Sequence, residues 1–561
     1  MTDAIQNPVL PGFHPDPSIL RVGRDFYLAT STFEWWPGVR IHHSRDLVHW
    51  QHLSYALTRR SQLDMRGNPD SGGIWAPCLS HRNGTYYMVF TNVRSLTGAY
   101  KDTPNYVVTA PHPSGPWSEP VYLHSRGFDP SLFHDDDGRS WLISMQRDHR
   151  AGRNPFYGIL LQEYDCEQRC LVGPVKNIFA GSPLGLVEGP HLYRHEGWYV
   201  LVTAEGGTFY GHAVTVARSR SIDGPYELSP QHPLLTSKGE SPAGLQRAGH
   251  ASLVDAGNGE WYIAHLCSRP LEWRQTATGN APGTAPGTAP EKAPANYEGL
   301  HSILGRETAL QRVEWTPDGW LRLAHGGVAP QSTLPAPALP PVPVEHEPPR
   351  DDFTGPNLSG HWNALREPFD ASWMSLKARP GHLRLIGRCS LMSKFEQSLV
   401  ARRQQHFDCE AETVLEFSPT IFQQMAGLVA YYNTQNHAYL HVTHDEDVRG
   451  RVLLLSVNDD GAMRQPAPPV AIGEAPRVWL RVRFEGDSFR FFYALAEGDW
   501  QPLGEPLPSK MLSDEYATHI DKGVSHSFGF TGNFIGLACQ DLSGSRLHAD
   551  FDHFTYRSLA P

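Results

Sequence analysis

The stretch FHPDPSIL, residues 13–20, decides the fold, because its pattern returns four more times along the chain. It places a carboxylate, Asp16, between two prolines and then runs into an apolar strand. The later copies are WAPCL from 75, FDPSLF from 128, VEGPHLY from 187 and GHASLV from 249. Aligning Pro17 with Pro77, Pro130, Pro190 and Ala251 gives steps of 60, 53, 60 and 61 residues. Repeats of this length predict sheet units such as the blades of a propeller.

Each repeat continues with a glycine and then a strand that carries aromatic residues. Glycine readily adopts the positive φ of a tight hairpin, and aromatic and β-branched residues favour strands. We therefore interpret these glycines, and Trp141, Trp198 and Trp261, as structural. The all-β pattern predicts a five-bladed propeller over residues 1–328. The five segments are GRDFYLA (23–29), GTYYMVF (84–90), GRSWLIS (138–144), GWYVLV (197–202) and GEWYIAH (259–265).

Two segments of biased composition punctuate the second half of the chain. Residues 276–296 are rich in Ala, Pro, Gly and Thr and are expected to form a loop inside the fifth repeat. Residues 329–350 are rich in proline and predict a linker. Alternating strands follow, such as 478–486 and 489–495, and predict a C-terminal β-sandwich over residues 351–561.

The composition limits where the protein acts and what it binds. The chain has 561 residues, of which 40% are hydrophobic and 19% charged, and its net charge of −11 argues against a nucleic-acid partner. Its seven cysteines show no metal-ligand spacing. The N-terminal residues lack the basic and apolar regions of a secretory signal, and no apolar run could span a membrane. We therefore expect a cytoplasmic protein with no membrane or nucleic-acid partner.

The starts of the five repeats suggest one shared site. The innermost strands of a propeller line its axis, so residues at equivalent positions can face a common pocket. Glycosidic hydrolysis needs one ionised carboxylate to deprotonate water and one protonated carboxyl to protonate the leaving oxygen. Each acid taken alone could instead serve a turn or an ion pair, and the common register favours the shared site. The aligned residues are Asp16, Ala76, Asp129, Gly189 (with Glu188 just before it) and His250.

Further distinctive segments accompany these motifs, and together they cover nearly the whole chain. The segments are 7–19, 31–50, 67–77, 127–138, 188–193, 203–208, 249–254 and 304–309. They resemble glycoside hydrolase family 43, and most of all its two-domain β-xylosidases. The resemblance implies that Asp16 is the general base, that Glu188 is the general acid, and that Asp129 orients this acid and tunes its pKa.

The resemblance also assigns substrate contacts. Arg306 is expected to bind sugar hydroxyls, and Phe33 and Trp75 to form apolar walls of the pocket. His250 is expected at the pocket floor, where a satisfied interior histidine is the alternative, and Phe530 of the sandwich is expected to cover the pocket. No metal ligand and no required cofactor are implied, although some relatives hold a calcium ion near the position that matches His250.

The implied activity is inverting, exo-acting release of D-xylose from the non-reducing end of β-1,4-xylooligosaccharides. An α-L-arabinofuranosidase, or an enzyme with both activities, is the closest alternative, because the two substrates place similar oxygens around the scissile bond. A sugar-binding propeller without catalysis would not need the paired acids. The expected partners are the xylooligosaccharide and further copies of the same chain in a homo-oligomer.

Overall fold

The computed structural model describes residues 4–272, 299–345, 348–521 and 524–559. Contacts divide the chain into two compact units. Met1–Arg269 and Arg306–Glu345 make up most of the first unit, and Glu298–Gly305 and His346–Pro561 make up most of the second. The predicted loop at 276–296 lies outside the described residues.

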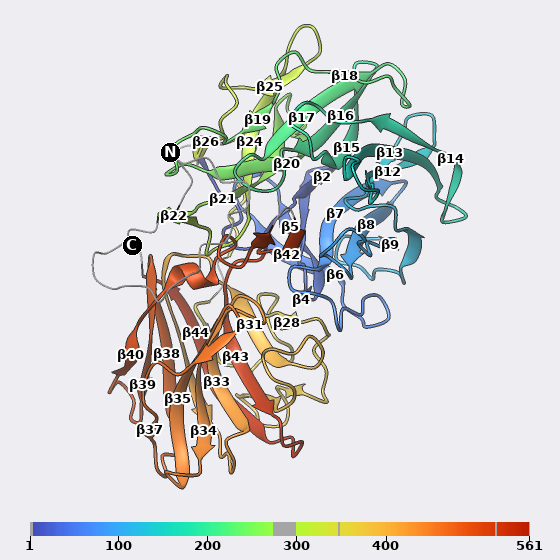
Figure 1. The fold of residues 1–561 in the computed structure, drawn as a ribbon. Coiled ribbons are helices and arrows are strands. Elements are labelled where there is room, and N and C mark those ends of the chain that lie inside the picture. The colour runs from blue at the N-terminus through green and yellow to red at the C-terminus, as the bar shows by residue number, and fades with distance from the viewer. Residues whose placement is uncertain (1–3, 273–298, 346–347, 522–523, 560–561) are drawn as a thin grey trace. The chain divides into compact units, whose positions relative to one another are not determined.

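The first unit is a propeller of five antiparallel sheets, as predicted (Figure 1). Four of the sheets have four strands, and in the fourth blade β19 also pairs with β17. Blades one and two contain β2 (Ser18–Val22), β3 (Asp25–Thr30), β5 (Gly38–Ser44), β6 (Gln51–Leu57), β7 (Gly73–Arg82), β8 (Thr85–Val93), β9 (Asn105–Ala110) and β10 (Val121–His124). Blade three contains β11 (Ser131–His134), β12 (Ser140–Arg147), β13 (Phe156–Asp165) and β14 (Cys170–Phe179). Blades four and five contain β15 (Glu188–His195), β16 (Trp198–Glu205), β17 (Ala213–Ser219), β18 (Glu227–Leu228), β19 (Leu235–Thr236), β20 (Gln246–Asp255), β21 (Trp261–Ser268), β24 (Glu307–Trp315) and β25 (Leu321–Leu323).

The hairpin between the first two strands of each blade turns at the predicted glycine. All five glycines have a positive φ, which a residue with a Cβ adopts at a cost. The values are 64° at Gly23, 76° at Gly84, 94° at Gly138, 79° at Gly197 and 89° at Gly259.

The hydrophobic core of the propeller lies between neighbouring blades. Leu142 of blade three packs in one cluster with Val89 of blade two, and Val202 of blade four packs in another with Ile263 of blade five. Blade-to-blade packing of this kind buries both faces of each sheet, so every inner strand is held at the axis from two sides.

The ring of blades is closed by the N-terminal segment. β1 (Ala4–Gln6) pairs with β26 (Thr333–Pro335). Asn7 donates to the carbonyl of Leu310 at 2.7 Å, and its side-chain oxygen accepts the Leu310 amide at 2.9 Å. The predicted linker at 329–350 therefore contains a strand of the propeller unit, which its proline content concealed.

The second unit is a β-sandwich of two large antiparallel sheets, and its one helical element among the described residues is the 3₁₀ helix η1 (Ser509–Leu512). The first sheet has the order β29 (Met374–Ser375), β30 (Leu383–Ile386), β44 (His548–Ser558), β32 (Asp408–Glu416), β38 (Val478–Glu485), β39 (Ser488–Ala494) and β40 (Gln501–Pro508), with β27 (Arg350–Asp351) on β44. The second has the order β31 (Ser398–Arg403), β43 (Phe534–Asp541), β33 (Gln424–Tyr431), β34 (His437–Asp445), β35 (Gly450–Asp459) and β36 (Ala462–Arg464), with β37 (Val470–Ala471) on β35.

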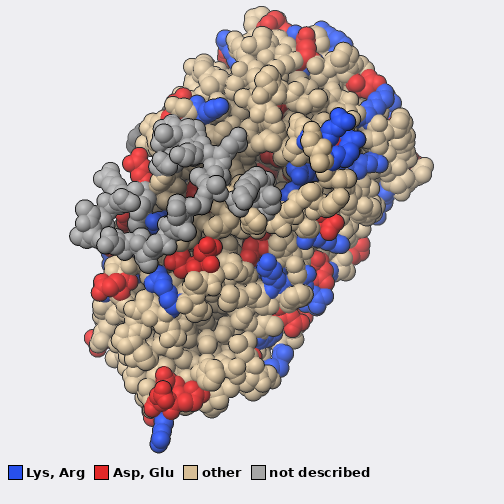
Figure 2. All heavy atoms as spheres, in the orientation of Figure 1, with Lys and Arg blue, Asp and Glu red and all other residues tan. Residues whose placement is uncertain are grey.

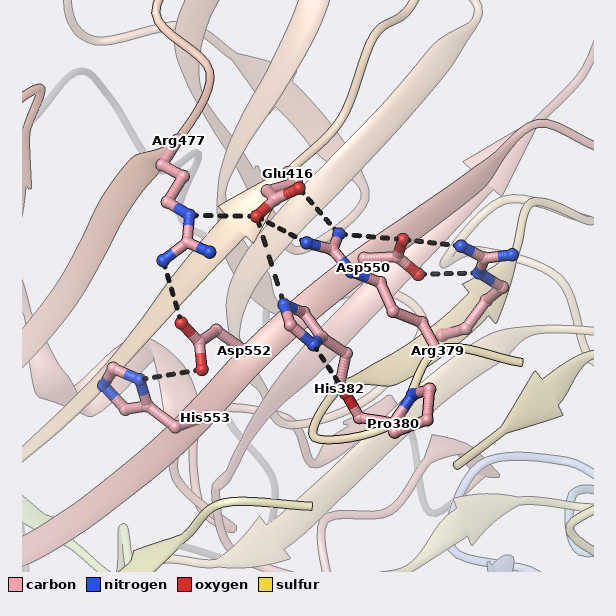
Figure 3. Close-up of polar contacts among 9 residues, drawn as sticks. Arg379, Pro380, His382, Glu416, Arg477, Asp550, Asp552 and His553 are labelled. Carbon is pink, nitrogen blue, oxygen red and sulfur yellow. Dashed lines mark hydrogen bonds and ion pairs between the residues drawn. The ribbon is translucent and has the colours of Figure 1, made fainter. Parts of the chain in front are cut away.

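A network of ion pairs joins strands of the first sandwich sheet (Figure 3). Arg379 lies between two carboxylates, 2.6 Å from Glu416 and 3.2 Å from Asp550. Arg384 binds Asp550 at 2.7 Å, and Arg477 binds Glu416 at 2.9 Å. Because Glu416 belongs to β32 and Asp550 to β44, the network fastens two adjacent strands.

The surface charge is mixed. On the face shown in Figure 2, Lys and Arg side chains of each unit are interspersed with Asp and Glu. Among the described residues, no helix is long and apolar enough to cross a membrane.

Candidate active site

A left-handed residue marks the same position at the start of all five inner strands. A positive φ is uncommon outside glycine, although Asp and His tolerate it better than most residues. In blades two, four and five, the pairing between the first two strands shifts close to the left-handed residue. Such an irregularity changes the direction of the side chains there. The five residues are those aligned from the sequence, with φ of 53° at Asp16, 36° at Ala76, 54° at Asp129, 55° at Gly189 and 45° at His250.

Asp16 of blade one is buried and has polar neighbours from three sides. The Ser31 hydroxyl donates to Oδ2 at 2.6 Å. Arg306 Nη1 lies 3.3 Å from Oδ1, and His250 Nδ1 lies 4.0 Å from the same oxygen. A hydroxyl and a guanidinium thus both present hydrogen-bond donors to this carboxyl, which fixes its orientation.

Asp129 of blade three lies beside the two other acids. Its Oδ2 accepts the backbone N–H of Gly189 at 3.0 Å, so it holds the peptide that follows Glu188. Burial raises the pKa of Asp129 well above its usual range, and the nearby carboxyls of Glu188 and Asp16 raise it further.

Glu188 is the first residue of β15 and is partly exposed. Burial, and next the negative charge of Asp16, raise the pKa of Glu188 to about 8, against the opposing effect of Arg306 and Arg147. At neutral pH this carboxyl therefore carries a proton that it can donate.

The acid of blade four, Glu188, lies one residue before the aligned left-handed position, because Gly189 occupies that position. A Cβ at Gly189 would lie 2.9 Å from the His250 ring, and φ is 55° there. Only glycine meets both conditions without strain.

Arg306 and two aromatic rings lie together beside the acids. Arg306, just before β24, also donates to the Thr208 hydroxyl at 3.1 Å. Its guanidinium lies 4.9 Å from the centre of the Phe33 ring, and the Phe33 and Trp75 ring centres are 5.7 Å apart. The structure thus brings the predicted hydroxyl-binding group and both predicted wall residues to the predicted acids.

His250 lies at the axis with its ring buried, and burial lowers its pKa, so the imidazole is neutral near pH 7. Among the described residues, no group of three His, Cys, Asp or Glu side chains could hold a metal ion. The calcium ion considered near His250 therefore has no support.

Phe530 belongs to the second unit, where it is buried and stacks on Phe528 with ring centres 5.2 Å apart. Its place over the pocket stays a prediction.

Three residues at the site are not evident from the aligned strand starts: Ser31, Thr208 and Arg147. Ser31 directly follows β3, Arg147 ends β12, and Thr208 comes shortly after β16. β3, β12 and β16 are each the second strand of a blade, and they run back toward the edge at which the inner strands begin. A search for polar residues at the ends of these return strands could have found them.

Comparisons with known proteins agree with this geometry. Residues 5–321 match the profile described as "Glycosyl hydrolases family 43", and residues 350–557 match the "Beta xylosidase C-terminal Concanavalin A-like domain". The chain is 47% identical to "Xylosidase/arabinosidase 43B" of Humicola insolens, over 99% of this chain and 98% of that protein. It is 45% identical to a "Xylan 1,3-beta-xylosidase" of Vibrio sp, over 99% of each. The crystal structure of xylan beta-1,4-xylosidase from Bacillus halodurans C-125 is 53% identical, superposes with a TM-score of 0.91, and covers 99% of this chain and 100% of that one.

Proposed function

Because the chain belongs to glycosyl hydrolase family 43, we propose that it is an inverting, exo-acting β-xylosidase. Its substrates are short β-1,4-xylooligosaccharides, and it releases D-xylose from their non-reducing end. The solved relative that is 53% identical is named as a xylan beta-1,4-xylosidase, which supports this linkage.

The observation that carries the proposal is the pairing of a protonated carboxyl with a second carboxyl that receives hydrogen-bond donors. Burial and the charge of Asp16 raise the pKa of Glu188 to about 8, whereas Ser31 and Arg306 present donors to Asp16. Inverting hydrolysis needs one carboxyl as acid and one as base.

In the proposed reaction, Asp16 accepts a proton from a water whose oxygen forms a bond to the anomeric carbon. The bond from that carbon to the leaving oxygen breaks, and Glu188 gives its proton to this oxygen. One water is consumed, no sugar becomes attached to the protein, and the configuration at the anomeric carbon inverts.

The surrounding residues orient this reaction. Asp129 holds the Gly189 peptide, and so the backbone that carries Glu188. Arg306 is placed to bind adjacent sugar hydroxyls with its planar guanidinium. Phe33 and Trp75 offer ring faces to the apolar side of a xylose ring. Every step uses groups of the chain itself, so we propose that catalysis needs no cofactor.

Proton NMR of xylobiose hydrolysis tests the proposal. The xylose formed first from the non-reducing unit should be the α-anomer, before mutarotation mixes the two forms. A β-anomer as first product would refute inversion. Glu188→Ala should lower turnover by several orders of magnitude with the fold intact, and near-wild-type turnover would refute its assignment as the acid.

An α-L-arabinofuranosidase is the second candidate, because the Humicola insolens relative is named for both activities. Comparing kcat/KM on the nitrophenyl β-D-xyloside and α-L-arabinofuranoside decides between them. The name of the Vibrio relative makes the linkage a separate question, which β-1,3- and β-1,4-linked xylobiose resolve in parallel assays.

Cytoplasmic location and homo-oligomeric assembly belong to the same proposal. A substrate of only a few sugar units can be imported, so an intracellular enzyme could reach it. Light scattering coupled to size-exclusion chromatography tests the oligomeric state, and fractionation of the native cells tests the location.

A further inference from the structure

Ser31 lies between blade one and blade two with its side chain fully buried. Its backbone N–H donates to the Pro15 carbonyl at 3.1 Å. Its hydroxyl oxygen accepts the Ala76 N–H at 2.7 Å, and the hydroxyl donates to Asp16 Oδ2 at 2.6 Å. Ser31 thus contacts the Pro15 carbonyl next to Asp16, the Asp16 carboxylate itself, and Ala76 at the equivalent position of blade two.

The direction of these bonds follows from counting protons. The Ala76 amide can only donate, so the Ser31 oxygen must accept there. A hydroxyl has a single proton, and the remaining close partner of that oxygen is Asp16 Oδ2. The proton of Ser31 therefore points at Asp16, and a proton on Oδ2 would meet it head-on. This arrangement holds the Asp16 carboxylate in one fixed rotation.

We infer that Ser31 is a positioning residue for the hydrolysis, which keeps the Asp16 carboxylate oriented as the general base. The inference rests on the proposed function, because it gives Ser31 a task only if Asp16 activates water. The inference also gives the Ala76 amide a role. By donating to the Ser31 oxygen, this amide fixes the rotation of the hydroxyl and directs its proton toward Asp16 Oδ2.

Other groups also act on Asp16, and they set the background for the test. Arg306 faces it from the segment before β24 and His250 from β20, while Asp129 and Glu188, whose pKa values the charge of Asp16 raises, lie in blades three and four. All four stay in place when Ser31 is changed. A shift in pH dependence on changing Ser31 therefore reports its own hydroxyl.

Ser252 provides a matched control for a purely structural role. It is also a buried serine between two blades, here five and one. Its hydroxyl oxygen accepts the Ile19 N–H at 2.9 Å, and the hydroxyl donates to the Pro17 carbonyl at 2.9 Å. The geometry repeats that of Ser31, except that the final acceptor is a neutral carbonyl instead of a carboxylate.

The experiment compares pH profiles of kcat/KM on nitrophenyl β-D-xyloside for the wild type and for Ser31→Ala, Ser31→Thr and Ser252→Ala. Because a misplaced catalytic group costs up to about a hundredfold, Ser31→Ala should lower kcat/KM about ten- to a hundredfold near neutral pH. Loss of the hydrogen bond to the carboxylate predicts that the acidic limb moves up by about one to two pH units. Ser31→Thr keeps the hydroxyl, so its acidic limb should lie at the same pH as in the wild type. Ser252→Ala should lower the midpoint of urea unfolding but leave the acidic limb at its wild-type pH.

The outcomes separate this inference from the proposed function. If the wild type hydrolyses xylosides and the limb of Ser31→Ala matches that of Ser252→Ala, Ser31 is structural and the inference is overturned. If Ser31→Ala does not fold, Ser31→Cys takes its place, because a thiol fills similar space but is a weak donor, and an unmoved limb again overturns the inference. If the wild type hydrolyses no glycoside, the proposed function fails first.

Discussion

Exchanging the proposed acid for its amide, Glu188→Gln, should make the propeller more stable at mildly alkaline pH than the wild type. The wild-type carboxyl has its pKa raised to about 8 from an ordinary value of 4.5, chiefly by burial. The unfolded chain releases this proton near pH 4.5, whereas the folded chain retains it until about pH 8. The contribution of the protonated group is thus fully present below the lower value and is lost as the pH rises through the upper one.

The size of the effect follows from the two pKa values. Between them the wild type loses about 1.4 kcal/mol of unfolding free energy per pH unit through this group, whereas glutamine loses none. From about pH 5 to about pH 7.5 the difference between variant and wild type should therefore grow by about 3 kcal/mol in favour of the variant. Removing the charge of Glu188 also removes one cause of the raised pKa of Asp129, so the measured difference belongs to the coupled pair.

Urea unfolding at the two pH values, followed by tryptophan fluorescence, measures this difference. The transition of the propeller unit has to be resolved from that of the sandwich, because a chain of two units need not unfold in one step. Glu196→Gln makes the same chemical change on an exposed turn of the same blade and should show no such pH dependence. A difference between Glu188→Gln and wild type that is equal at both pH values would mean that Glu188 is ionised throughout, and the assignment of the acid would be refuted.

Three further changes test other parts of the structure. Arg147→Gln should move the alkaline limb of kcat/KM to higher pH, because the Arg147 charge lowers the pKa of Glu188. Gly427→Ala should destabilise the sandwich by about 1–3 kcal/mol, since its Cβ would lie 2.0 Å from a backbone carbonyl oxygen, whereas Gly450→Ala meets nothing within 4 Å and should be nearly neutral in urea unfolding. Asp550→Asn should lower the melting temperature at neutral pH, and the deficit should shrink as the pH falls below about 4, because hydrogen bonds from arginines outweigh burial and hold the pKa of this carboxyl below its usual value.

The fold could be predicted because its information is local and repeated. A short phrase before each inner strand, and a glycine after it, recur in all five blades. The glycines turn the chain with positive φ, and the phrase sets the left-handed residue at the axis. Repetition made each weak local pattern testable against four others, which a single motif such as DPS at 129–131 would not allow.

The pairings between distant segments could not be predicted, because they depend on packing. β44, at the end of the chain, lies between β30 and β32, so the order of the sandwich sheet does not follow the order of its strands in the sequence. The pairing of β1 with β26 joins two segments with no shared motif, one of them inside a proline-rich stretch. Likewise, Ser31 reaches Asp16 only because β3 returns along β2.

In each blade, the size of the left-handed residue at the aligned position decides which side chain of that blade reaches the site. This aligned position is called the register position below. In blades one, three and five the register residue itself, Asp16, Asp129 or His250, reaches the axis. In blades two and four that position holds Ala76 or Gly189, and the residue just before it, Trp75 or Glu188, reaches the site instead. A substituent at Gly189 would strike the His250 ring, so a small register residue makes room at the axis in a way that a larger one could not. The proposed acid, Glu188, thus lies one residue away from the position of the other two acids for a steric reason, and an alignment that demanded acids at the same position would have missed it.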